Sequence, residues 1–186
     1  MLKTPDATFS SDDPKDITRR IRNAGPEKTL NVVLISVESL SGDYVEGLDV
    51  SNHRHLMPNL DALASKSLFF TQLYANGTRT VRGLEALSLS VPPTPGESIV
   101  KRPDNEHLWS LADVFNAKGY TSEFVYGGYG YFDNMNHFFA NNGYAAVDRN
   151  VIDAKDIHAE NVWGVADEDL FTLVMKRMDD AYAKGK

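Results

Sequence analysis

NVVLISVE, at residues 31–38, is an apolar run rich in β-branched side chains, and it ends on the carboxylate of Glu38. A short run of this kind is typical of a strand that is buried on both faces of a parallel sheet. In open α/β sheets, binding sites form at the carboxyl ends of the strands. The run therefore predicts a core strand and places Glu38 at the sheet edge where a site is expected.

Strands and helices alternate along the rest of the chain, which predicts an α/β fold with a mainly parallel sheet and helices on both of its faces. The further strands are predicted at residues 68–74 and 121–126, and the helices at residues 58–64, 81–90, 107–118 and 167–183. The apolar stripe predicted for the last helix comprises Phe171, Val174, Met175, Met178 and Tyr182. The alternation stops on a helix, so we expect the sheet to be incomplete in this chain.

Composition restricts the domain organisation and the partners. Residues 1–29 are polar and contain three prolines, which predicts a linker or lead-in, and the folded domain is expected over residues 30–186. The formal net charge is −7, so the basic surface that nucleic acid requires is missing and no nucleic-acid partner is expected. The chain has no cysteine, which excludes disulfides, thiolate zinc sites and a cysteine nucleophile.

A second motif, GTRTVRG at residues 77–83, joins a loop to a predicted helix. Carboxylate and hydroxyl oxygens such as those of Glu38 and Thr80 suit Mg²⁺ or Mn²⁺, and Zn²⁺ when histidine is also supplied. A bound cation lowers the pKa of a hydroxyl, which would make Thr80 a useful nucleophile. The alternatives are that Glu38 is a solvated loop residue and that Thr80 only caps the helix.

Two kinds of anion-binding group surround Thr80. Guanidinium groups, such as those of Arg79 and Arg82, match the geometry of phosphate oxygens. If Thr80 opens the helix, the backbone N–H groups of Val81, Arg82 and Gly83 are also expected to face an anion. Together these groups predict a phosphoryl-binding site.

A third motif, GGYGYFDNMN at residues 127–136, follows the third predicted strand and combines glycines, aromatic rings and amides. Its position at the end of a strand predicts a ligand-binding loop. Rings and amides suit polyols, so the chain could alternatively be a non-catalytic α/β module that holds a glycerol or sugar headgroup, and the loop could equally serve packing alone.

Four segments together carry a resemblance to a known family. They are NVVLISVES at residues 31–39, PNLDALA at 58–64, TRTVRGLEAL at 78–87 and WGVADEDL at 163–170. They resemble the extracellular catalytic domain of lipoteichoic acid synthases and related phosphoglycerol transferases, in the sulfatase-like branch of the alkaline phosphatase superfamily. The resemblance implies an alkaline phosphatase-like fold. It also implies transfer of glycerol phosphate from a phosphatidylglycerol-like lipid to a cell-envelope polymer or glycan through a phosphothreonine intermediate.

The resemblance implies roles for particular residues. Glu38 and Thr80 would hold one divalent metal ion (Mn²⁺ or Mg²⁺, with Zn²⁺ as the alternative), and Thr80 would be the nucleophile. Arg82 would bind the phosphate. The closest counterparts to the family's headgroup-binding Trp and Arg are Phe132 and Asn134, which differ from them in type.

Several features are left open by the resemblance. Thr78 is the alternative nucleophile, and Trp163 is either a core aromatic or a wall of the donor pocket. The family completes its metal site with an Asp-His pair on a later strand, and this sequence contains no Asp-His dipeptide. His53 and His55 are candidate ligands that are usually solvated in such a loop. We therefore expect the N-terminal part of a catalytic domain, inactive by itself.

The resemblance also implies a cellular location for the protein. Family members carry this domain outside the cytoplasmic membrane on an N-terminal helical bundle. The chain is therefore expected to be extracytoplasmic and attached to the cell membrane through a transmembrane region that it lacks, with residues 1–29 as the stalk.

Two other reactions use the same scaffold. Sulfatases that hydrolyse sulfate or phosphate esters need a Cys or Ser nucleophile with proline two residues later, and the sequence Thr80-Val81-Arg82 has neither. Phosphoethanolamine transferases also use a threonine but usually carry disulfides, which a chain without cysteine cannot form.

Overall fold

The computed structural model describes residues 8–13, 15–16, 18–20, 25–45, 48 and 56–185. The chain divides into two compact units, Met1–Ser39 and Leu40–Lys186, and each is described by itself. His53 and His55, the histidines offered as metal ligands, lie outside the described residues.

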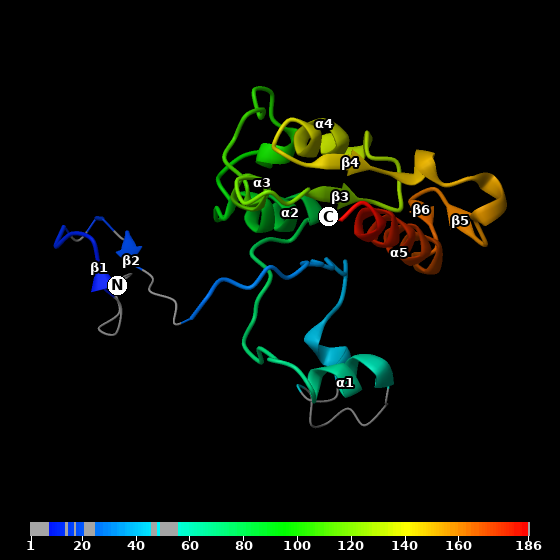
Figure 1. Cartoon of the computed structure of the whole chain (residues 1–186), viewed down its shortest axis with the longest axis horizontal. Helices are drawn as coiled ribbons and strands as arrows, with labels where there is room; N and C mark the ends of the chain where they lie inside the picture. Colours follow the sequence, from blue (N-terminus) through cyan, green and yellow to red (C-terminus); the bar gives the residue numbers. More distant parts are fainter. Residues whose placement is uncertain are drawn as a thin grey trace. The chain divides into compact units, whose positions relative to one another are not determined.

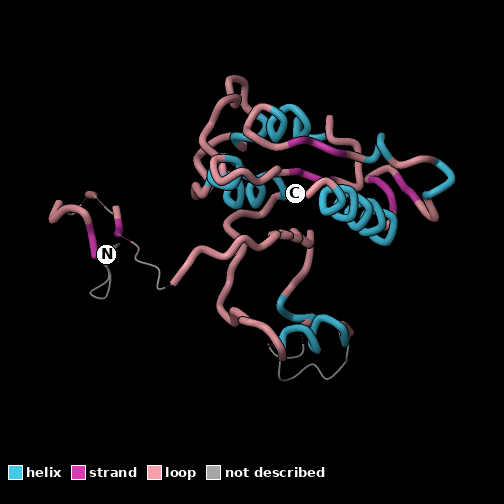
Figure 2. The backbone as a smooth tube through the Cα atoms, in the orientation of Figure 1, coloured by secondary structure: helices cyan, strands magenta, loops and turns pink. Residues whose placement is uncertain are grey.

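The first unit contains a short antiparallel pair and a long irregular segment. Strand β1 (Thr8–Phe9) pairs with β2 (Arg19–Arg20) in the register Thr8↔Arg20 and Phe9↔Arg19. Residues 25–37 have no regular secondary structure, as the tube in Figure 2 shows. The predicted boundary between residues 29 and 30 stays a prediction.

Two of the predicted strands are absent from the described part of the chain. Residues 31–37 and 68–74 pair with no other segment there, and most of their large apolar side chains are exposed. A strand exists only through hydrogen bonds to a neighbour, whereas an apolar run indicates only that its side chains favour burial. The prediction of these two strands is wrong for this structure.

The third predicted strand is confirmed, and it belongs to a parallel pair in the second unit. Strand β3 (Glu123–Val125) pairs with β4 (Ala145–Val147), with Phe124 opposite Ala146. Strand β4 was not predicted from the sequence. The connection between the two strands contains helix α4 (Met135–Ala140), so β3, α4 and β4 form a short β-α-β unit, in which α4 packs on β4 (Figure 1).

The remaining elements are short except for two helices. The helices are α1 (Pro58–Ala64), α2 (Thr80–Leu89), α3 (Leu111–Asn116) and α5 (Asp167–Ala183), and a hairpin is formed by β5 (Glu160–Asn161) and β6 (Gly164–Val165). The 3₁₀ turns are η1 (Gly42–Tyr44), η2 (Ile99–Lys101), η3 (Phe132–Asn134), η4 (Arg149–Val151) and η5 (Ala154–Asp156). No helix in these described ranges combines the length and the apolar character needed to cross a bilayer.

Local chemistry explains where the helices begin and end. Pro58 stands in the first turn of α1, as expected from its fixed backbone angle. Helix α3 begins later than predicted because Ser110 and Asp113 form a capping box around its first turn. Gly119 follows α3 in the left-handed region, with φ of 86°, which closes the helix as predicted.

The hydrophobic core of the second unit lies between two helices, a 3₁₀ turn and the parallel pair. Its buried residues are Val81, Leu89, Val100, Met135, Phe138 and Phe139. The ring of Phe139 stacks on Phe124 of β3 with centroids 3.7 Å apart. This core therefore fixes α2, α4 and η2 against the sheet.

Helix α5 has the predicted bounds but packs through a different face. Most of the predicted stripe is exposed, including Phe171, Met175 and Tyr182. The packed side carries Leu170, which lies close to Gly127, and Arg177, whose guanidinium binds both carboxylate oxygens of Glu123 at 2.5 and 2.6 Å. The predicted stripe is therefore wrong, although the helix is right.

Candidate functional site

Thr80 is the first residue of α2, and it is exposed. The preceding residue, Arg79, has an extended backbone (φ −133°, ψ 147°) and is the N-cap. The Arg79 carbonyl accepts hydrogen bonds from the backbone N–H groups of Arg82 at 2.9 Å and Gly83 at 3.3 Å. Two of the three N–H groups predicted to face an anion are thus used within the first turn, and that part of the prediction is wrong.

The loop before Thr80 folds back closely onto the first turn of α2. A Cβ atom at Gly77 would lie 2.6 Å from the Cβ of Arg82, closer than side-chain atoms tolerate. Only glycine therefore permits this approach, and the approach sets the entry of the chain into the helix at Thr80.

Arg82 is held by partners within the protein. Its Nη1 donates to Glu85 Oε1 at 2.9 Å, and its Nη2 donates to the carbonyl oxygen of Gly96. These contacts join the first turn of α2 to the proline-rich loop that follows the helix. The predicted role of Arg82 in binding phosphate stays a prediction, and the structure adds a positioning role that the sequence did not indicate.

Glu85 is the buried centre of this network. Its Oε2 accepts hydrogen bonds from Ser98 Oγ and from Ile99 N, each at 2.6 Å. Burial raises the pKa of Glu85, but the hydrogen bonds from Ser98, Arg82 and Ile99 outweigh burial and hold that pKa below its ordinary value. Glu85 is therefore an ionised anchor for Arg82. Sequence reasoning missed it because the rest of α2 and an irregular, proline-containing loop separate Glu85 from Ser98, and no periodicity relates the two residues.

Glu38 lies on an exposed turn of the first unit, whereas Thr80 lies in the second. Their predicted meeting at one cation stays a prediction. A carboxylate and a hydroxyl are suitable oxygen donors, but Mg²⁺ takes about six ligands. Within residues 8–185, as far as they are described, no group of three or more His, Asp or Glu side chains is arranged to hold a metal ion. The described residues thus supply only part of a donor set.

The aromatic loop after β3 brings together two exposed rings. Phe132, at the start of η3, meets Trp163 of the β5–β6 hairpin edge to face, with centroids 5.7 Å apart. Trp163 is 65% exposed, so the interpretation of Trp163 as a core aromatic is wrong. The pair presents an aromatic surface near the carboxyl end of β3. In open α/β sheets, ligands bind at the carboxyl ends of the strands.

Asn134 has a left-handed backbone (φ 62°), and its Nδ2 donates to the carbonyl of Val100 at 3.0 Å. Beside it, Asp133 pairs with Lys101 at 3.1 Å. Both contacts fasten η3 to η2. Asn134 therefore holds the loop that carries Phe132, and its predicted contact with a headgroup stays a prediction.

A buried carboxylate holds the same loop from the other side. Asp148 Oδ2 accepts from Gly130 N at 3.0 Å and from Asn136 Nδ2 at 2.8 Å. Burial raises the pKa of Asp148, but these bonds and those from Asn150 outweigh it, so the pKa is lowered. The loop is thus anchored at both ends, to η2 and to the residue after β4.

The glycines of this loop permit close packing within the protein. A Cβ atom at Gly128 would collide with the carbonyl oxygen of Trp163, and one at Gly130 would collide with the side chain of Asn136. Val165 N also donates to the Gly127 carbonyl at 3.0 Å. The alternative that the loop serves packing therefore holds at its glycines, while the exposed ring of Phe132 remains available to a ligand.

Asp169 and His158 are not adjacent in the sequence, but they form an Asp–His pair in the structure. Asp169, in the first turn of α5, accepts from His158 Nδ1 at 2.5 Å and from the His158 backbone N–H at 2.9 Å. The His158 ring is exposed and the Asp169 side chain is buried. The two residues are eleven positions apart, and no spacing rule for helices or strands relates them.

The comparisons with known proteins assign the family. The sulfatase family matches residues 30–184, so this chain belongs to the sulfatase family. It is also similar to a solved structure described as a protein in the alkaline phosphatase superfamily from Vibrio parahaemolyticus, with 38% sequence identity and a TM-score of 0.61. The similarity covers 65% of this chain, and the chain spans only 30% of that protein's length.

The comparisons confirm the predicted alkaline phosphatase-like α/β fold with a parallel sheet. Members of this superfamily are hydrolases or transferases and typically depend on divalent metal ions. The chain therefore belongs to a superfamily whose members are enzymes.

Proposed function

We propose that this chain is part of a metal-dependent phosphoglycerol transferase of the lipoteichoic acid synthase type, in which Thr80 is the nucleophile. The donor is a phosphatidylglycerol-like lipid, and the acceptor is a cell-envelope polymer or glycan. The enzyme acts outside the cytoplasmic membrane, to which a transmembrane region beyond this chain attaches it.

The observation that carries the proposal is the position of Thr80 as an exposed hydroxyl at the start of the ten-residue helix α2. The N–H groups of Arg82 and Gly83 bond to the Arg79 carbonyl, but the helix dipole still gives the amino end of α2 partial positive charge, which favours an incoming phosphate. Sulfatase family membership supports a nucleophile in such a site. Threonine, without a proline two residues later, favours transfer over sulfate ester hydrolysis.

The reaction has two displacement steps at phosphorus. In the first, Thr80 Oγ1 loses its proton and attacks the phosphorus of the donor. The Oγ1–P bond forms, the bond from phosphorus to the diacylglycerol oxygen breaks, and that oxygen takes up a proton. In the second, an acceptor hydroxyl loses its proton and attacks the same phosphorus, the Oγ1–P bond breaks, and Thr80 is protonated again.

The other predicted residues act around this threonine. Arg82, oriented by Glu85, lies two residues after Thr80 and would supply positive charge toward the phosphate. Phe132 and Asn134 would contact the glycerol headgroup from the anchored loop after β3. Glu38 and Thr80 would hold the metal ion together with ligands beyond the described residues, and a bound divalent cation lowers the pKa of a coordinated hydroxyl.

The test is to follow release of diacylglycerol from a fluorescent phosphatidylglycerol by the full-length protein. Thr80→Ala should abolish release, and Thr80→Ser should retain a measurable fraction because it keeps a hydroxyl. Thr78→Ala is the matched control, since Thr78 lies in the same exposed loop. Turnover by Thr80→Ala would reject the proposal, and loss of turnover only in Thr78→Ala would assign the nucleophile to Thr78.

The fate of the glycerol phosphate separates transfer from hydrolysis. A transferase should deliver it to an added glycan or polymer, with little free glycerol phosphate. Free glycerol phosphate that is unaffected by any acceptor would favour a hydrolase on the same scaffold. Saturable headgroup binding with no covalent intermediate and no diacylglycerol would favour a non-catalytic module.

A further inference from the structure

Arg79 occupies the N-cap of α2, a position from which arginine cannot cap the helix. Favoured N-cap side chains accept a hydrogen bond from the backbone N–H of the second or third helical residue. Helix α3 has such a cap, because Ser110 Oγ accepts from Ala112 N at 3.1 Å. A guanidinium group has donors but no acceptor, and no side chain among the described residues caps α2. The N-cap of α2 therefore carries a cation where helices usually carry an acceptor.

The missing acceptor leaves one backbone donor of the first turn without a partner. Arg82 N and Gly83 N both donate to the carbonyl of Arg79, at 2.9 and 3.3 Å. The N–H of Val81, the second residue of α2, has no acceptor in the part of the chain that the structure describes. The first N–H groups of a helix have no partner within the helix. An anion beside Thr80 would supply the acceptor that the Arg79 side chain does not.

The two arginines that flank Thr80 differ in their partners. The Arg82 side chain is only 16% exposed, and its Nη1 and Nη2 bind Glu85 and the carbonyl of Gly96. An ionised carboxylate therefore offsets the charge of Arg82. Arg79 is exposed, and its guanidinium has no ion pair or hydrogen bond within the described residues. Of the two, Arg79 is the one whose charge is available to an incoming anion.

We propose that Arg79 is the residue that contacts the phosphate of the donor directly, while Arg82 acts from behind the turn as a charge that Glu85 holds in place. The inference rests on the proposed function, because it names a substrate-binding residue of the Thr80 site. A guanidinium group presents paired N–H donors that match two oxygens of a phosphate. Arg79 would donate to the non-bridging oxygens while Thr80 Oγ1 attacks, and it would neither gain nor lose a proton.

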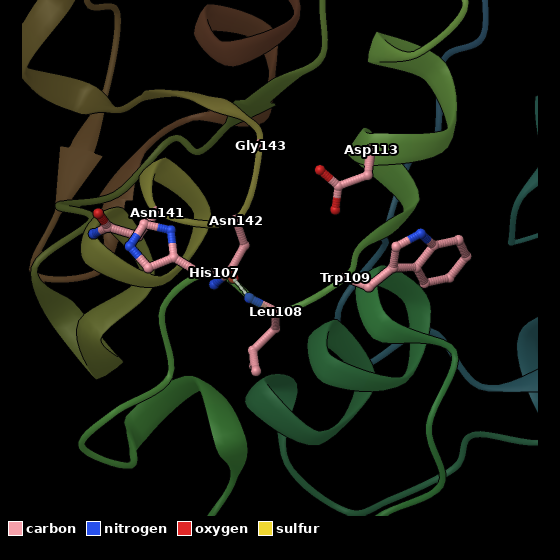
Figure 3. Close-up of a pocket in the computed structure, with 7 residues that line it drawn as sticks. All are labelled: His107, Leu108, Trp109, Asp113, Asn141, Asn142 and Gly143. Atoms are coloured by element: carbon pink, nitrogen blue, oxygen red, sulfur yellow. Dashed lines mark hydrogen bonds between the residues drawn. The ribbon is translucent and has the colours of Figure 1, made fainter.

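A pocket between the chain entering α3 and the turn after α4 does not offer phosphate a second site of this kind (Figure 3). The described residues that line it include the carboxylate of Asp113 but no arginine or lysine. Figure 3 shows the Trp109 indole turned away from His107, with Leu108 and Asn142 between them. These side chains do not converge on one small anion. Phosphate binding by the protein should therefore report the start of α2.

Binding of glycerol phosphate to the full-length protein is the first test, measured by calorimetry in a Thr80→Ala background so that turnover does not interfere. Arg79→Gln should weaken binding by at least about tenfold, because it removes charge-assisted hydrogen bonds. Lys176→Gln is the matched control, since it removes one exposed positive charge from α5 and should leave the affinity unchanged. Equal affinity with and without the Arg79→Gln substitution would overturn the inference.

Two further substitutions separate a ligand-binding role of Arg79 from a structural one. Serine is a favoured N-cap residue, so Arg79→Ser should raise the urea midpoint of unfolding while it weakens glycerol phosphate binding as much as Arg79→Gln does. Arg79→Lys keeps the charge but loses the paired donors, so its affinity should lie between those of Arg79 and Arg79→Gln. Unchanged binding in Arg79→Ser, whatever its urea midpoint, would overturn the inference.

Release of diacylglycerol from fluorescent phosphatidylglycerol distinguishes failure of this inference from failure of the proposed function. If both are correct, Thr80→Ala abolishes release and Arg79→Gln lowers kcat/KM by at least about tenfold. Loss of release in Thr80→Ala together with unchanged kcat/KM in Arg79→Gln would overturn the role of Arg79 alone. Release by Thr80→Ala would reject the proposed function, and the role of Arg79 as the nucleophile's partner would fall with it.

Discussion

Glu85 and Ser98, thirteen residues apart in the chain, are joined by a hydrogen bond of 2.6 Å between Oε2 and Oγ in the interior of the second unit. Glu85 also binds Arg82, and through it the turn that begins with Thr80. The Glu85 network therefore holds the first turn of α2, on which the candidate nucleophile Thr80 lies. A change at the buried Glu85 carboxylate should alter both the stability of the protein and the position of the exposed Thr80 hydroxyl.

Removing the Glu85 carboxylate should destabilise the protein strongly. Glu85→Ala leaves Ser98 Oγ and Ile99 N without their acceptor and Arg82 without its ion pair, and we expect a loss of about 2–4 kcal/mol in the free energy of unfolding. Urea denaturation measures it. Glu97→Ala is the control, since that exposed carboxylate forms a surface ion pair with Lys101 and its loss should change stability by about 0.5 kcal/mol or less. Equal effects of the two changes would contradict the network.

The His158–Asp169 pair should make stability depend on pH at two limits. The hydrogen bond to Asp169 raises the pKa of His158, so this contribution is complete below the ordinary histidine pKa and is lost as pH rises through the raised value. The hydrogen bond from His158 lowers the pKa of Asp169, so that contribution is complete above the ordinary carboxyl pKa and is lost as pH falls through the lowered value. The pair should stabilise most between about pH 4 and 6.5.

NMR titration of the His158 ring checks this directly. Asp169→Asn should return the His158 pKa toward its ordinary value, and the unfolding free energies of the native protein and of His158→Gln should converge at high pH. A His158 titration that Asp169→Asn leaves unchanged would show that the pair does not form in solution.

Substitution by alanine should have opposite effects on the free energy of unfolding at Gly128 and at Gly83. A Cβ at Gly128 meets the backbone carbonyl of Trp163, which cannot move aside, so Gly128→Ala should cost about 1–3 kcal/mol. Gly83 lies inside α2 with no atom within 4 Å of a built Cβ, so Gly83→Ala should stabilise by about 0.5–1 kcal/mol. Thermal unfolding of the pair provides the measurement. Destabilisation by Gly83→Ala, or tolerance of Gly128→Ala, would contradict the described packing.

Metal binding should require Glu38 if the proposed function is correct. Loss of a group that only supports a ligand costs about tenfold to hundredfold in metal affinity, and loss of a ligand should cost at least as much. Titration of the full-length protein with Mn²⁺ should show this for Glu38→Ala but not for Glu27→Ala, another exposed acid of the first unit. Comparable affinity in the two variants would remove Glu38 from the site.

Helical signals were read correctly from the sequence where they are local. Helix α5 runs over the predicted residues, and α2 begins at Thr80, next to the predicted start. Proline, capping residues and regular apolar spacing act within a few residues of one another. The packed face of α5 was not predictable in the same way, because Leu170 and Phe171 begin two adjacent apolar rows and only the sheet selects between them.

Long-range contacts account for what the sequence did not reveal. Strand β4 is short and follows Gly143 and Tyr144 without a distinctive pattern, and it becomes a strand through its pairing with β3. The Glu85–Ser98 and His158–Asp169 contacts likewise join residues that no periodicity relates. The position of Thr80 was accessible from its neighbours, whereas the groups that support it were not.

The two exposed apolar runs, residues 31–37 and 68–74, have a consequence for the behaviour of the purified chain. Neither contains a proline or a charged residue, and both are rich in β-branched or aromatic side chains. Segments of this length and composition stack between molecules into cross-β fibrils. Concentrated solutions of this chain should therefore develop thioflavin fluorescence with time, and a lysine placed within either run should delay it.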